Sequence, residues 1–354
     1  MTAEPTGDHP MAPVTTTTGP TGPTAADALL PDGGSAVVNP AHPDGPSVVA
    51  IGGGHGLAAT LRATRRYAGR ITAVVSVADD GGSSGRLRET LGVVALGDLR
   101  RCLSALADER SLLGSSLEYR FPAGDLAGHP LGNVLLAGLA ATATDLVAAI
   151  DEVARAVGTV GRVLPAAGEP VTLTAEGLWR QPKISGQVAV QNTEGVRRIA
   201  LEPPDPATPP AVVHAIEAAD QVVIGPGSLF TSVLAAAVVP GILDALRRTG
   251  ARRVYVCNLR PQPPETARFT TADHVQALLD HGIPVDVALC HGITGEEPER
   301  AVPGSVKVDV VTRSVARAGG ATHDTELLGD ALSELSRAVV RSGHGSGSPS
   351  VGPG

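Results

Sequence analysis

The chain has 354 residues, with 28 basic and 36 acidic side chains and a formal net charge of −8, and its length suffices for one large α/β domain or two smaller ones. An acidic chain lacks the clustered positive field that nucleic acids require, so we expect no nucleic-acid partner. Aromatic residues make up only 2% of the chain, so its core must come from Ala, Val, Leu and Ile.

The cysteine and hydropathy patterns favour a cytoplasmic protein. Cys102, Cys257 and Cys290 lie in apolar runs without Cys-x-x-Cys spacing, so we expect buried, reduced thiols. No signal-peptide pattern is visible, and no uncharged apolar run reaches the roughly 18 residues of a membrane span. We therefore predict a cytoplasmic location and no membrane span.

The two ends of the chain differ in composition from its middle. Residues 1–46 are rich in Pro, Thr, Gly and Ala with little apolar periodicity, which is typical of disorder. The tail over 341–354 has the same character. We predict one α/β domain over residues 47–340 between these two segments.

Two apolar runs, 48–51 and 71–77, open this domain. They lack polar alternation, which predicts strands of a parallel sheet, and residues 57–67 predict the crossover helix of a βαβ unit. Each strand leads into a glycine loop and a helix N-terminus, a combination that favours phosphate at the carboxyl edge of a sheet. The candidate residues are Gly53, Gly54, His55 and Gly56 in the first loop and Gly81, Gly82, Ser83 and Ser84 in the second.

Asp79 and Asp80 directly precede the second glycine loop. Carboxylates repel a bare phosphate, so they indicate a ribose hydroxyl, a sugar hydroxyl or a divalent cation at this place. Adjacent side chains at the end of an extended strand point in opposite directions. We therefore expect only one of the two to face the site.

Two later segments supply further polar candidates. Asp98 has the position of an N-cap ahead of leucines at helical spacing. In the first turn of that helix, Arg100 either stays solvated or reaches a phosphate in the nearby loops. His129 and Asn133 lie among glycines ahead of the apolar run 134–150, which predicts a third loop leading into a helix, and both are candidates for ligand contact.

The pattern changes over residues 162–210. Alternating segments, among them 187–191, and several turn signals predict a small antiparallel β insertion. The parallel pattern then resumes with strands at 221–224, 254–259, 285–289 and 306–311 and with helices at 273–281 and from residue 325.

A fourth glycine loop follows the strand at 221–224 and also leads into a helix. Its candidate residues are Gly225, Gly227 and Ser228. The four loops together predict an open α/β sheet with a ligand site at its carboxyl edge.

No single catalytic signature fits the sequence. Gly54-x-Gly56-x-x-Ala59, with Asp79 about twenty residues further on, is a weak form of the dinucleotide pattern. No Lys follows a glycine loop, which excludes a Walker A site, and no nucleophile elbow or cysteine metal site is present. The residues alone indicate a phosphate-bearing, nucleotide-like ligand without an evident nucleophile or general base, and a dinucleotide oxidoreductase stays open as an alternative.

Six segments together resemble one known family. They are Ile-Gly-Gly-Gly-His-Gly-Leu from residue 51, Ala-Asp-Asp-Gly-Gly-Ser-Ser-Gly-Arg-Leu from residue 78, Gly-Asp-Leu-Arg from residue 97, Gly-His-x-Leu-Gly-Asn from residue 128, Ile-Gly-Pro-Gly-Ser-Leu-Phe-Thr-Ser from residue 224 and Val-Cys-Asn-Leu from residue 256. From about residue 48 to 340 the chain is similar to the gluconeogenesis factor (YvcK-like) branch of the 2-phospho-L-lactate transferase (CofD-like) superfamily.

The resemblance implies an α/β fold with a Rossmann-like, mostly parallel sheet and helices on both faces, often in a homodimer. It implies a ligand of the UDP-N-acetylglucosamine kind, and a role in cell shape and wall synthesis during gluconeogenic growth, with a regulatory protein partner as a further expectation. It favours Arg100 as a phosphate contact and adds Asn258 to the site. We expect a regulator rather than a catalyst, with no certain cofactor.

The transferase branch of the superfamily implies the alternative function. Its members move a phospholactyl group from a guanosine nucleotide onto a deazaflavin with Mg²⁺, which Asp79 or Asp80 would hold here. The scarcity of aromatic residues counts against a flat acceptor pocket. The chain departs from the family pattern at His55, Arg101, Phe230, Pro264, Ala267 and Arg268.

Overall fold

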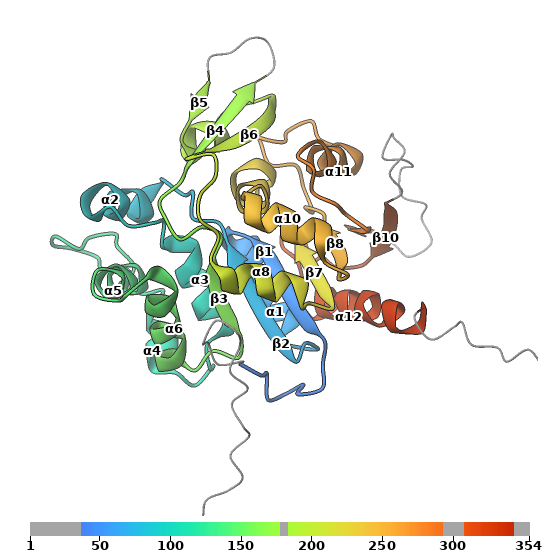
Figure 1. Ribbon diagram of the computed structural model, residues 1–354, viewed down its shortest axis with the longest axis horizontal. Coiled ribbons are helices and arrows are strands. Elements are labelled where there is room, and N and C mark those ends of the chain that lie inside the picture. The colour runs from blue at the N-terminus through green and yellow to red at the C-terminus, as the bar shows by residue number, and fades with distance from the viewer. Residues whose placement is uncertain (1–36, 178–182, 293–307, 343–354) are drawn as a thin grey trace, which may run out of the picture. The chain divides into compact units, whose positions relative to one another are not determined.

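The computed structural model describes residues 37–177, 183–292 and 308–342 (Figure 1). The predicted disordered segments fall outside these ranges up to residue 36 and from residue 343. Residues 37–46, however, pack onto the domain, because the buried Asn39 side chain donates to the carbonyls of Arg65 and Ala68, each at 2.9 Å. The packed part of the chain thus begins ahead of the predicted boundary.

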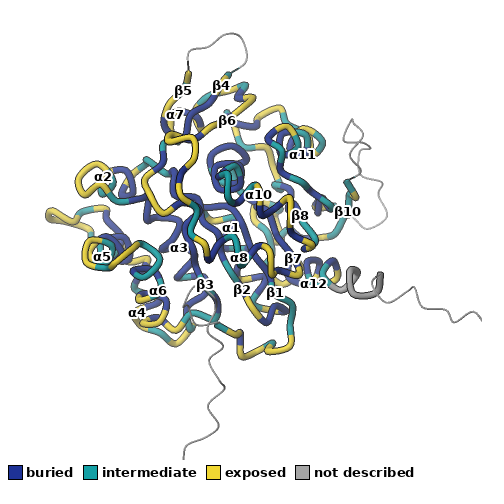
Figure 2. Tube along the Cα trace, in the orientation of Figure 1, coloured by how far each residue is buried: buried dark blue, intermediate teal, exposed yellow. Residues whose placement is uncertain are grey.

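A seven-stranded sheet forms the centre of the fold, and every neighbouring pair of strands in it is parallel. This confirms the predicted fold class. The middle strands are almost entirely buried (Figure 2), as their Val and Ile runs require. In spatial order the strands are β10 (Asp309–Arg313), β9 (Val287–His291), β8 (Arg252–Val256), β7 (Gln221–Ile224), β1 (Ser47–Gly52), β2 (Arg70–Val75) and β3 (Arg162–Pro165).

The strand order reverses at β1. The chain passes from β1 to β2 and β3 on one side, and later builds β7, β8, β9 and β10 on the other. Ala50 of β1 lies opposite Ala73 of β2 and Val223 of β7. The boundary between β1 and β7 is therefore the topological switch point, where open α/β sheets bind their ligands at the carboxyl edge.

Helices cover both faces of the large sheet (Figure 1). On one face α1 packs against α3 and α12, and on the other α8 packs against α10. The helix predicted from residue 325 is confirmed. The helices are α1 (Gly54–Thr64), α2 (Gly82–Leu91), α3 (Gly97–Leu106), α4 (Leu112–Ser116), α5 (Leu131–Ala140), α6 (Leu146–Val157), α7 (Gln187–Gln191), α8 (Pro210–Glu217), the π-helix η1 (Leu229–Leu234), α9 (Ala235–Ala237), α10 (Pro240–Arg248), α11 (Thr271–Asp280) and α12 (Thr325–Ser342).

A three-stranded antiparallel sheet, at the top of Figure 1, contains β5 (Ile184–Ser185), β4 (Thr172–Gly177) and β6 (Val196–Glu202) in that order. The predicted antiparallel insertion is thus present, although β3 extends the large sheet instead. The strand predicted over 187–191 is wrong, since this segment forms α7. Asp80 accepts hydrogen bonds from two backbone N–H groups at the start of α7, which favours a helix there.

Two predicted helix boundaries also need correction. Asp98 is not the N-cap of α3, because Leu96 holds that position and Asp98 lies in the first turn. The apolar run over 134–150 forms two helices, since α5 ends at Ala140. Asp145 then caps α6 by accepting from the Ala148 N–H at 2.9 Å.

None of the helices within the described ranges has, by itself, the length and apolarity to cross a bilayer. One bent pair, Leu229–Ala237 with Pro240–Arg248 at 73°, meets the length and composition criteria only when the two are combined. Most of the first helix of this pair is buried in the core.

Candidate functional site

The first and fourth glycine loops meet at the switch point of the sheet. Gly56 lies so close to the fourth loop that a Cβ atom on it would sit 2.1 Å from the Pro226 carbonyl oxygen. The Gly225 N–H donates to the Ile51 carbonyl at 2.9 Å, and the Thr60 hydroxyl donates to the Gly225 carbonyl at 3.0 Å. The two loops therefore form one continuous glycine-rich surface. Only residues without a side chain allow the loops to approach this closely.

Asn258 and Glu265 fix the fourth loop and the helix that follows it. The Asn258 amide accepts from the Gly227 N–H at 3.0 Å and donates to the Gly227 carbonyl at 2.8 Å. Buried Glu265 accepts from the N–H groups of Phe230 and Thr231 at 2.7 and 3.0 Å, and burial raises the pKa of its carboxyl. Glu265 could not be predicted from the sequence, because nothing in its Pro-rich surroundings marks it as a cap.

Four predicted residues form one hydrogen-bonded series, here called the donor chain. Arg100 Nη1 lies 2.9 Å from Asn133 Oδ1, and Asn133 Nδ2 lies 3.0 Å from Ser83 Oγ. Ser83 Oγ in turn lies 2.8 Å from His129 Nδ1. All four residues are buried. The fold thus joins α3, the start of α5, the second loop and the third loop through the donor chain of Arg100, Asn133, Ser83 and His129.

The direction of the donor chain follows from its first member. A guanidinium group can only donate, so the Asn133 amide oxygen faces Arg100 and its NH₂ group faces Ser83. We take the Ser83 hydroxyl as the donor to His129 Nδ1, and in this arrangement the ring proton lies on Nε2. Burial lowers the pKa of His129, so the ring is neutral at neutral pH. His129 therefore keeps one N–H donor for a ligand oxygen.

Arg100 is the most deeply buried charge of the site, with 1% of its surface exposed. Its Nε donates to Glu118 Oε1 at 3.1 Å. Its Nη2 is buried and has no partner among the described residues. Burial lowers the pKa of the guanidinium, and Glu118 opposes this. An unpaired buried N–H group is costly, so an anionic ligand oxygen would find a favourable partner at Nη2.

Asp79 and Asp80 have different surroundings. Asp80 uses both carboxylate oxygens to accept from the backbone N–H groups of Gln187 and Val188, at 2.8 and 2.9 Å. Asp79 accepts from the nearby Gly81 N–H at 2.9 Å and interacts with the Ser84 hydroxyl, and burial raises the pKa of its carboxyl. Asp80 thus ties the second loop to α7, while Asp79 stays beside that loop.

Asp98 reaches the N-terminus of α1 instead of capping α3. One of its carboxylate oxygens accepts from the Gly54 N–H at 2.7 Å, and the other accepts from Arg101 Nη1 at 2.5 Å. The free N–H groups and the dipole of a helix N-terminus favour a carboxylate there. Asp98 thus takes one N–H group of the first loop, as Asp79 takes the Gly81 N–H of the second.

The other predicted residues fall into two groups. The Ser84 hydroxyl oxygen accepts from the Gly97 N–H at 3.2 Å and so ties the second loop to α3. His55 and Gly82 are exposed, and Gly227 and Ser228 are half-buried at the rim of the fourth loop. Ligand contacts of all these residues stay a prediction.

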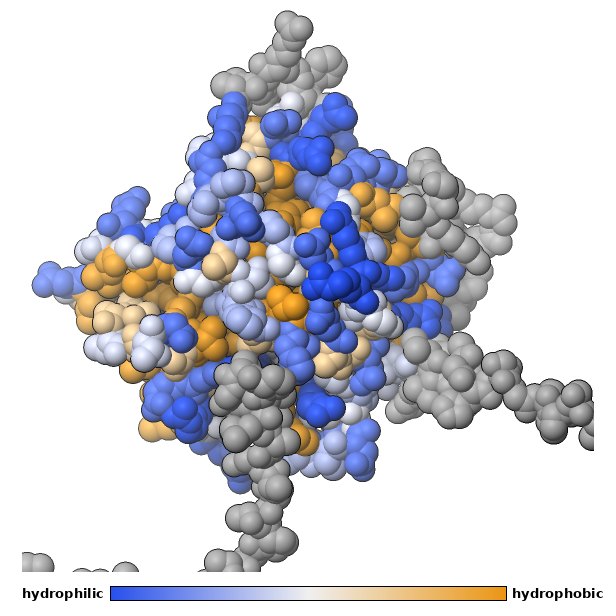
Figure 3. Space-filling model, viewed as in Figure 1, coloured by the Kyte–Doolittle hydropathy of each residue, from blue (hydrophilic) through white to orange (hydrophobic). Residues whose placement is uncertain are grey.

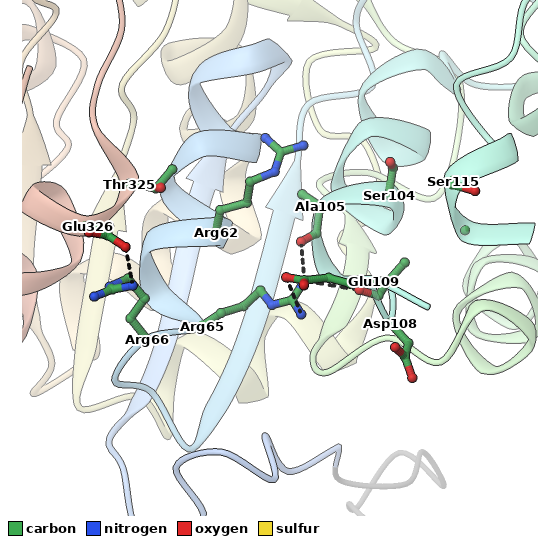
Figure 4. Close-up of a pocket in the computed structure, with 12 residues that line it drawn as sticks. Arg62, Arg65, Arg66, Ser104, Ala105, Asp108, Glu109, Ser115, Thr325 and Glu326 are labelled. Atoms are coloured by element: carbon green, nitrogen blue, oxygen red, sulfur yellow. Dashed lines mark hydrogen bonds and ion pairs between the residues drawn. The ribbon is translucent and has the colours of Figure 1, made fainter. Parts of the chain in front are cut away.

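The opposite edge of the large sheet also has a cavity, of about 450 Å³, beside the end of α1 (Figure 4). Arg65 donates there to the carbonyls of Ala105 and Ala107, and Arg66 pairs with Glu326 at 3.1 Å. Arg62 has no partner among the described residues. None of the predicted site residues lines this cavity.

Comparison with known proteins identifies the family. The sequence profile of the 2-phospho-L-lactate transferase CofD family matches residues 48–320. The chain belongs to this family. A Mycobacterium leprae relative is 46% identical over 316 residues, covering 84% of this chain and 87% of its own. Proteins named gluconeogenesis factor from Halalkalibacterium halodurans and Bacillus subtilis are 42% and 40% identical, covering 70% and 67% of this chain and 77% and 75% of their own.

These relatives place the chain in the gluconeogenesis factor branch of the CofD-like superfamily, as the six segments predict. A solved structure shares the fold of this CofD family member. The crystal structure of a protein member of the UPF0052 family from Bacillus halodurans matches with a TM-score of 0.75 at 35% identity. The match covers 84% of this chain and 99% of that chain, so the fold extends over nearly all of the solved relative.

Proposed function

We propose that this protein binds a nucleotide sugar of the UDP-N-acetylglucosamine kind at the carboxyl edge of the large sheet and acts as a regulator. The observation that carries this proposal is the donor chain. Its two ends, Arg100 Nη2 and His129 Nε2, have no partner among the described residues. Each end is an N–H donor, the kind of group from which phosphate oxygens accept.

The residues around the donor chain supply the other contacts that such a ligand needs. The backbone of the second loop can hold a phosphate at the N-terminus of α2. Asp79 beside it can accept hydrogen bonds from the hydroxyl groups of a ribose or a sugar. A nucleotide sugar combines a diphosphate with two hydroxyl-bearing rings, so it uses the donors and the acceptor together.

Ser83 and His129 also have the distance of a nucleophile and its base. However, Ser83 is held between Asn133 and His129, and the described residues place no carboxylate on the far nitrogen of His129. Such a carboxylate would be needed to orient the ring as a base. The donor chain thus suits binding better than nucleophilic catalysis.

The alternative function is a Mg²⁺-dependent phospholactyl transferase with a deazaflavin acceptor. Mg²⁺ usually takes one or two carboxylates together with substrate phosphates. Asp80 is engaged with α7 and Asp98 with α1 and Arg101, which leaves Asp79 as the candidate ligand. Among the described residues, no group of three or more His, Cys, Asp or Glu side chains could hold a metal ion. The donor chain offers N–H groups for phosphate oxygens, whereas only Asp79 is left for a metal, so we favour binding without transfer.

Family membership supports three further parts of the proposal. As a gluconeogenesis factor, the protein acts in the cytoplasm, supports cell shape and wall synthesis during gluconeogenic growth, and signals through a regulatory protein partner. We also propose a homodimer. Large apolar side chains stay exposed at Leu112, Leu113, Tyr119 and Leu126, and Figure 3 shows apolar surface gathered over α5. A second copy of the chain would cover such a surface, which light scattering on the purified chain would test.

Isothermal titration tests the ligand. We expect UDP-N-acetylglucosamine to bind more tightly than UDP alone, and NAD(P) and guanosine nucleotides to bind weakly. Arg100→Lys removes the fork that spans Glu118 and Asn133, so affinity should fall about tenfold or more. Arg62→Ala, at the opposite edge of the sheet, is the matched control and should leave affinity unchanged. Tight NAD(P) binding without UDP-sugar binding would overturn the proposal.

A further inference from the structure

Cys257 and Cys290 lie side by side at the carboxyl edge of the large sheet. Cys257 directly follows β8, and Cys290 belongs to β9. The register pairs Val256 with Leu289, so the two cysteines are the next pair along the parallel strands. Their sulfur atoms are 3.0 Å apart, and both cysteines are free thiols.

The backbone of this pair allows a disulfide. Neighbouring strands lie about 4.8 Å apart, and cysteines that form disulfides have Cα atoms about 4.4–6.8 Å apart. The sulfur atoms would have to approach by about 1 Å to reach the usual S–S bond length of about 2.05 Å. The change is therefore small, but it occurs directly beside the fourth glycine loop.

The residue after Cys257 connects this pair to the candidate site. Asn258 makes two hydrogen bonds to Gly227 and so holds the fourth loop in place. The Cys257 N–H also donates to the Leu289 carbonyl at 2.9 Å, which links the position of Cys257 to that of β9. Movement of Cys257 toward Cys290 would therefore displace Asn258, because one peptide bond joins the two residues.

We propose that Cys257 and Cys290 form a peroxide-sensitive dithiol whose disulfide displaces Asn258 and lowers the affinity of the site. The expected loss of affinity rests on the proposed function, whereas the formation of the disulfide does not. The two thiols differ, because the hydrogen bond from Cys257 lowers the pKa of the Cys290 thiol. A lower pKa gives more thiolate, the form that reacts with peroxide.

The chemistry balances with hydrogen peroxide as the oxidant. The Cys290 thiolate attacks one peroxide oxygen, the O–O bond breaks, and the hydroxide that leaves takes a proton to become water. The Cys257 sulfur then attacks the Cys290 sulfur, so the S–S bond forms and the S–O bond breaks. The second hydroxide leaves with the Cys257 proton as water. The two thiols together lose two electrons, and one hydrogen peroxide is reduced to two waters.

Thiol counting on the full-length chain tests the chemistry. The reduced chain has three free thiols, and after peroxide and denaturing alkylation we expect one to remain, with a peptide that links Cys257 to Cys290. Cys102→Ala is the matched control and should still lose both remaining thiols. Cys257→Ser and Cys290→Ser should form no internal disulfide. Three alkylatable thiols in the treated wild-type chain, or oxidised thiols without the linked peptide, would overturn the proposal.

Two further measurements separate this proposal from the proposed function. Oxidation should weaken UDP-N-acetylglucosamine binding about tenfold or more, dithiothreitol should restore it, and Cys257→Ser should show no change with peroxide. If the reduced chain does not bind the UDP-sugar, the proposed function fails. Hydrogen exchange then tests the effect of the disulfide on the fourth loop without any ligand, because the disulfide should speed exchange of the Gly227 amide. Unchanged exchange in the disulfide form would overturn the link to the loop.

Discussion

The two edges of the large sheet hold their polar side chains in different ways. At the carboxyl edge, buried and half-buried side chains bond to backbone groups or to one another, as Asn258 does with Gly227 and Arg100 with Asn133. At the opposite edge, Arg66 pairs with Glu326, and both side chains are exposed. Such exposed ion pairs contribute only about 0–1 kcal/mol to stability. The carboxyl edge is therefore arranged by the fold before a ligand arrives, whereas the opposite edge combines exposed ion pairs with Arg65, which donates to backbone carbonyls.

The largest expected effect comes from the contact between the first and fourth loops. Gly56→Ala would place its Cβ atom 2.1 Å from the Pro226 carbonyl oxygen, so the loops must separate. We expect a loss of about 1–3 kcal/mol in the free energy of unfolding, together with loss of ligand binding. Denaturant unfolding measures this. Gly138→Ala is the matched control, because no atom lies within 4 Å of its added Cβ, and it should not destabilise the chain.

A substitution at Asn133 should reverse the direction of the hydrogen bonds in the donor chain. Asn133→Asp keeps the shape and still accepts from Arg100, but it replaces the NH₂ donor by an oxygen, so Ser83 must donate to residue 133. His129 then carries its proton on Nδ1, and Nε2 accepts instead of donating. We expect UDP-N-acetylglucosamine affinity to fall about tenfold or more. Nitrogen-15 NMR of the ring reads the tautomer, and an unchanged tautomer with unchanged affinity would contradict the assigned direction.

Matched Asp→Asn variants should distinguish the role of Asp79 from that of Asp80. Asp79→Asn removes a charge-assisted hydrogen bond to the ligand, so affinity should fall about ten- to a hundredfold, equivalent to about 1.5–3 kcal/mol. Asp80→Asn keeps one of two acceptor oxygens for α7, so the melting temperature should fall while ligand affinity changes less. Calorimetric titration and thermal unfolding of both variants decide between the two roles. The reverse pattern would assign the ligand to Asp80.

The raised pKa of Asp79 adds a pH dependence. A carboxyl whose pKa is raised on folding binds its proton more tightly in the folded chain, so it lowers stability as the pH rises from the unfolded pKa through the folded one. Above both pKa values this cost is fully present. We therefore expect Asp79→Asn to be at least as stable as the wild type at neutral pH, and the difference to vanish in acid. Thermal unfolding across pH measures it, and a less stable variant at neutral pH would contradict the raised pKa.

The smallest expected effect lies at the opposite edge. Arg66→Gln breaks the pair with Glu326, which should change stability by less than about 1 kcal/mol and leave UDP-N-acetylglucosamine affinity unchanged. Added salt should reduce even this difference, because salt screens exposed charges. A loss of ligand affinity in this variant would remove the distinction between the two edges.

The fold could be predicted from the sequence because its signals are local. Apolar runs such as the one that became β7 (Gln221–Ile224) specify buried parallel strands. The errors arose from contacts between distant residues. Asp80 caps α7 from 107 positions away, and Asp98 binds Gly54 from 44 positions away. Periodicity within a short window carries no information on such partners, so the segment 187–191 and the role of Asp98 were predicted wrongly.

The same limit applies to the site. Glycine loops and helix starts pointed to the carboxyl edge, and the polar residues of the donor chain were candidates one by one. Their order, and thus the two N–H groups at its ends, depends on three-dimensional contacts such as that between Ser83 and Asn133. Glu265 stayed hidden because its function is to bind the backbone of η1.

Hydrogen exchange with and without UDP-N-acetylglucosamine tests most directly whether the carboxyl edge binds the ligand. At saturation we expect slower exchange of the backbone amides at residues 81–84 and at Gly225, Gly227 and Ser228, because these loops would contact the phosphates and the sugar. The amides at residues 62–66 and 104–115, which flank the cavity at the opposite edge, should not change. Slower exchange confined to that cavity, or no change in the glycine loops at saturating ligand, would contradict a site at the carboxyl edge.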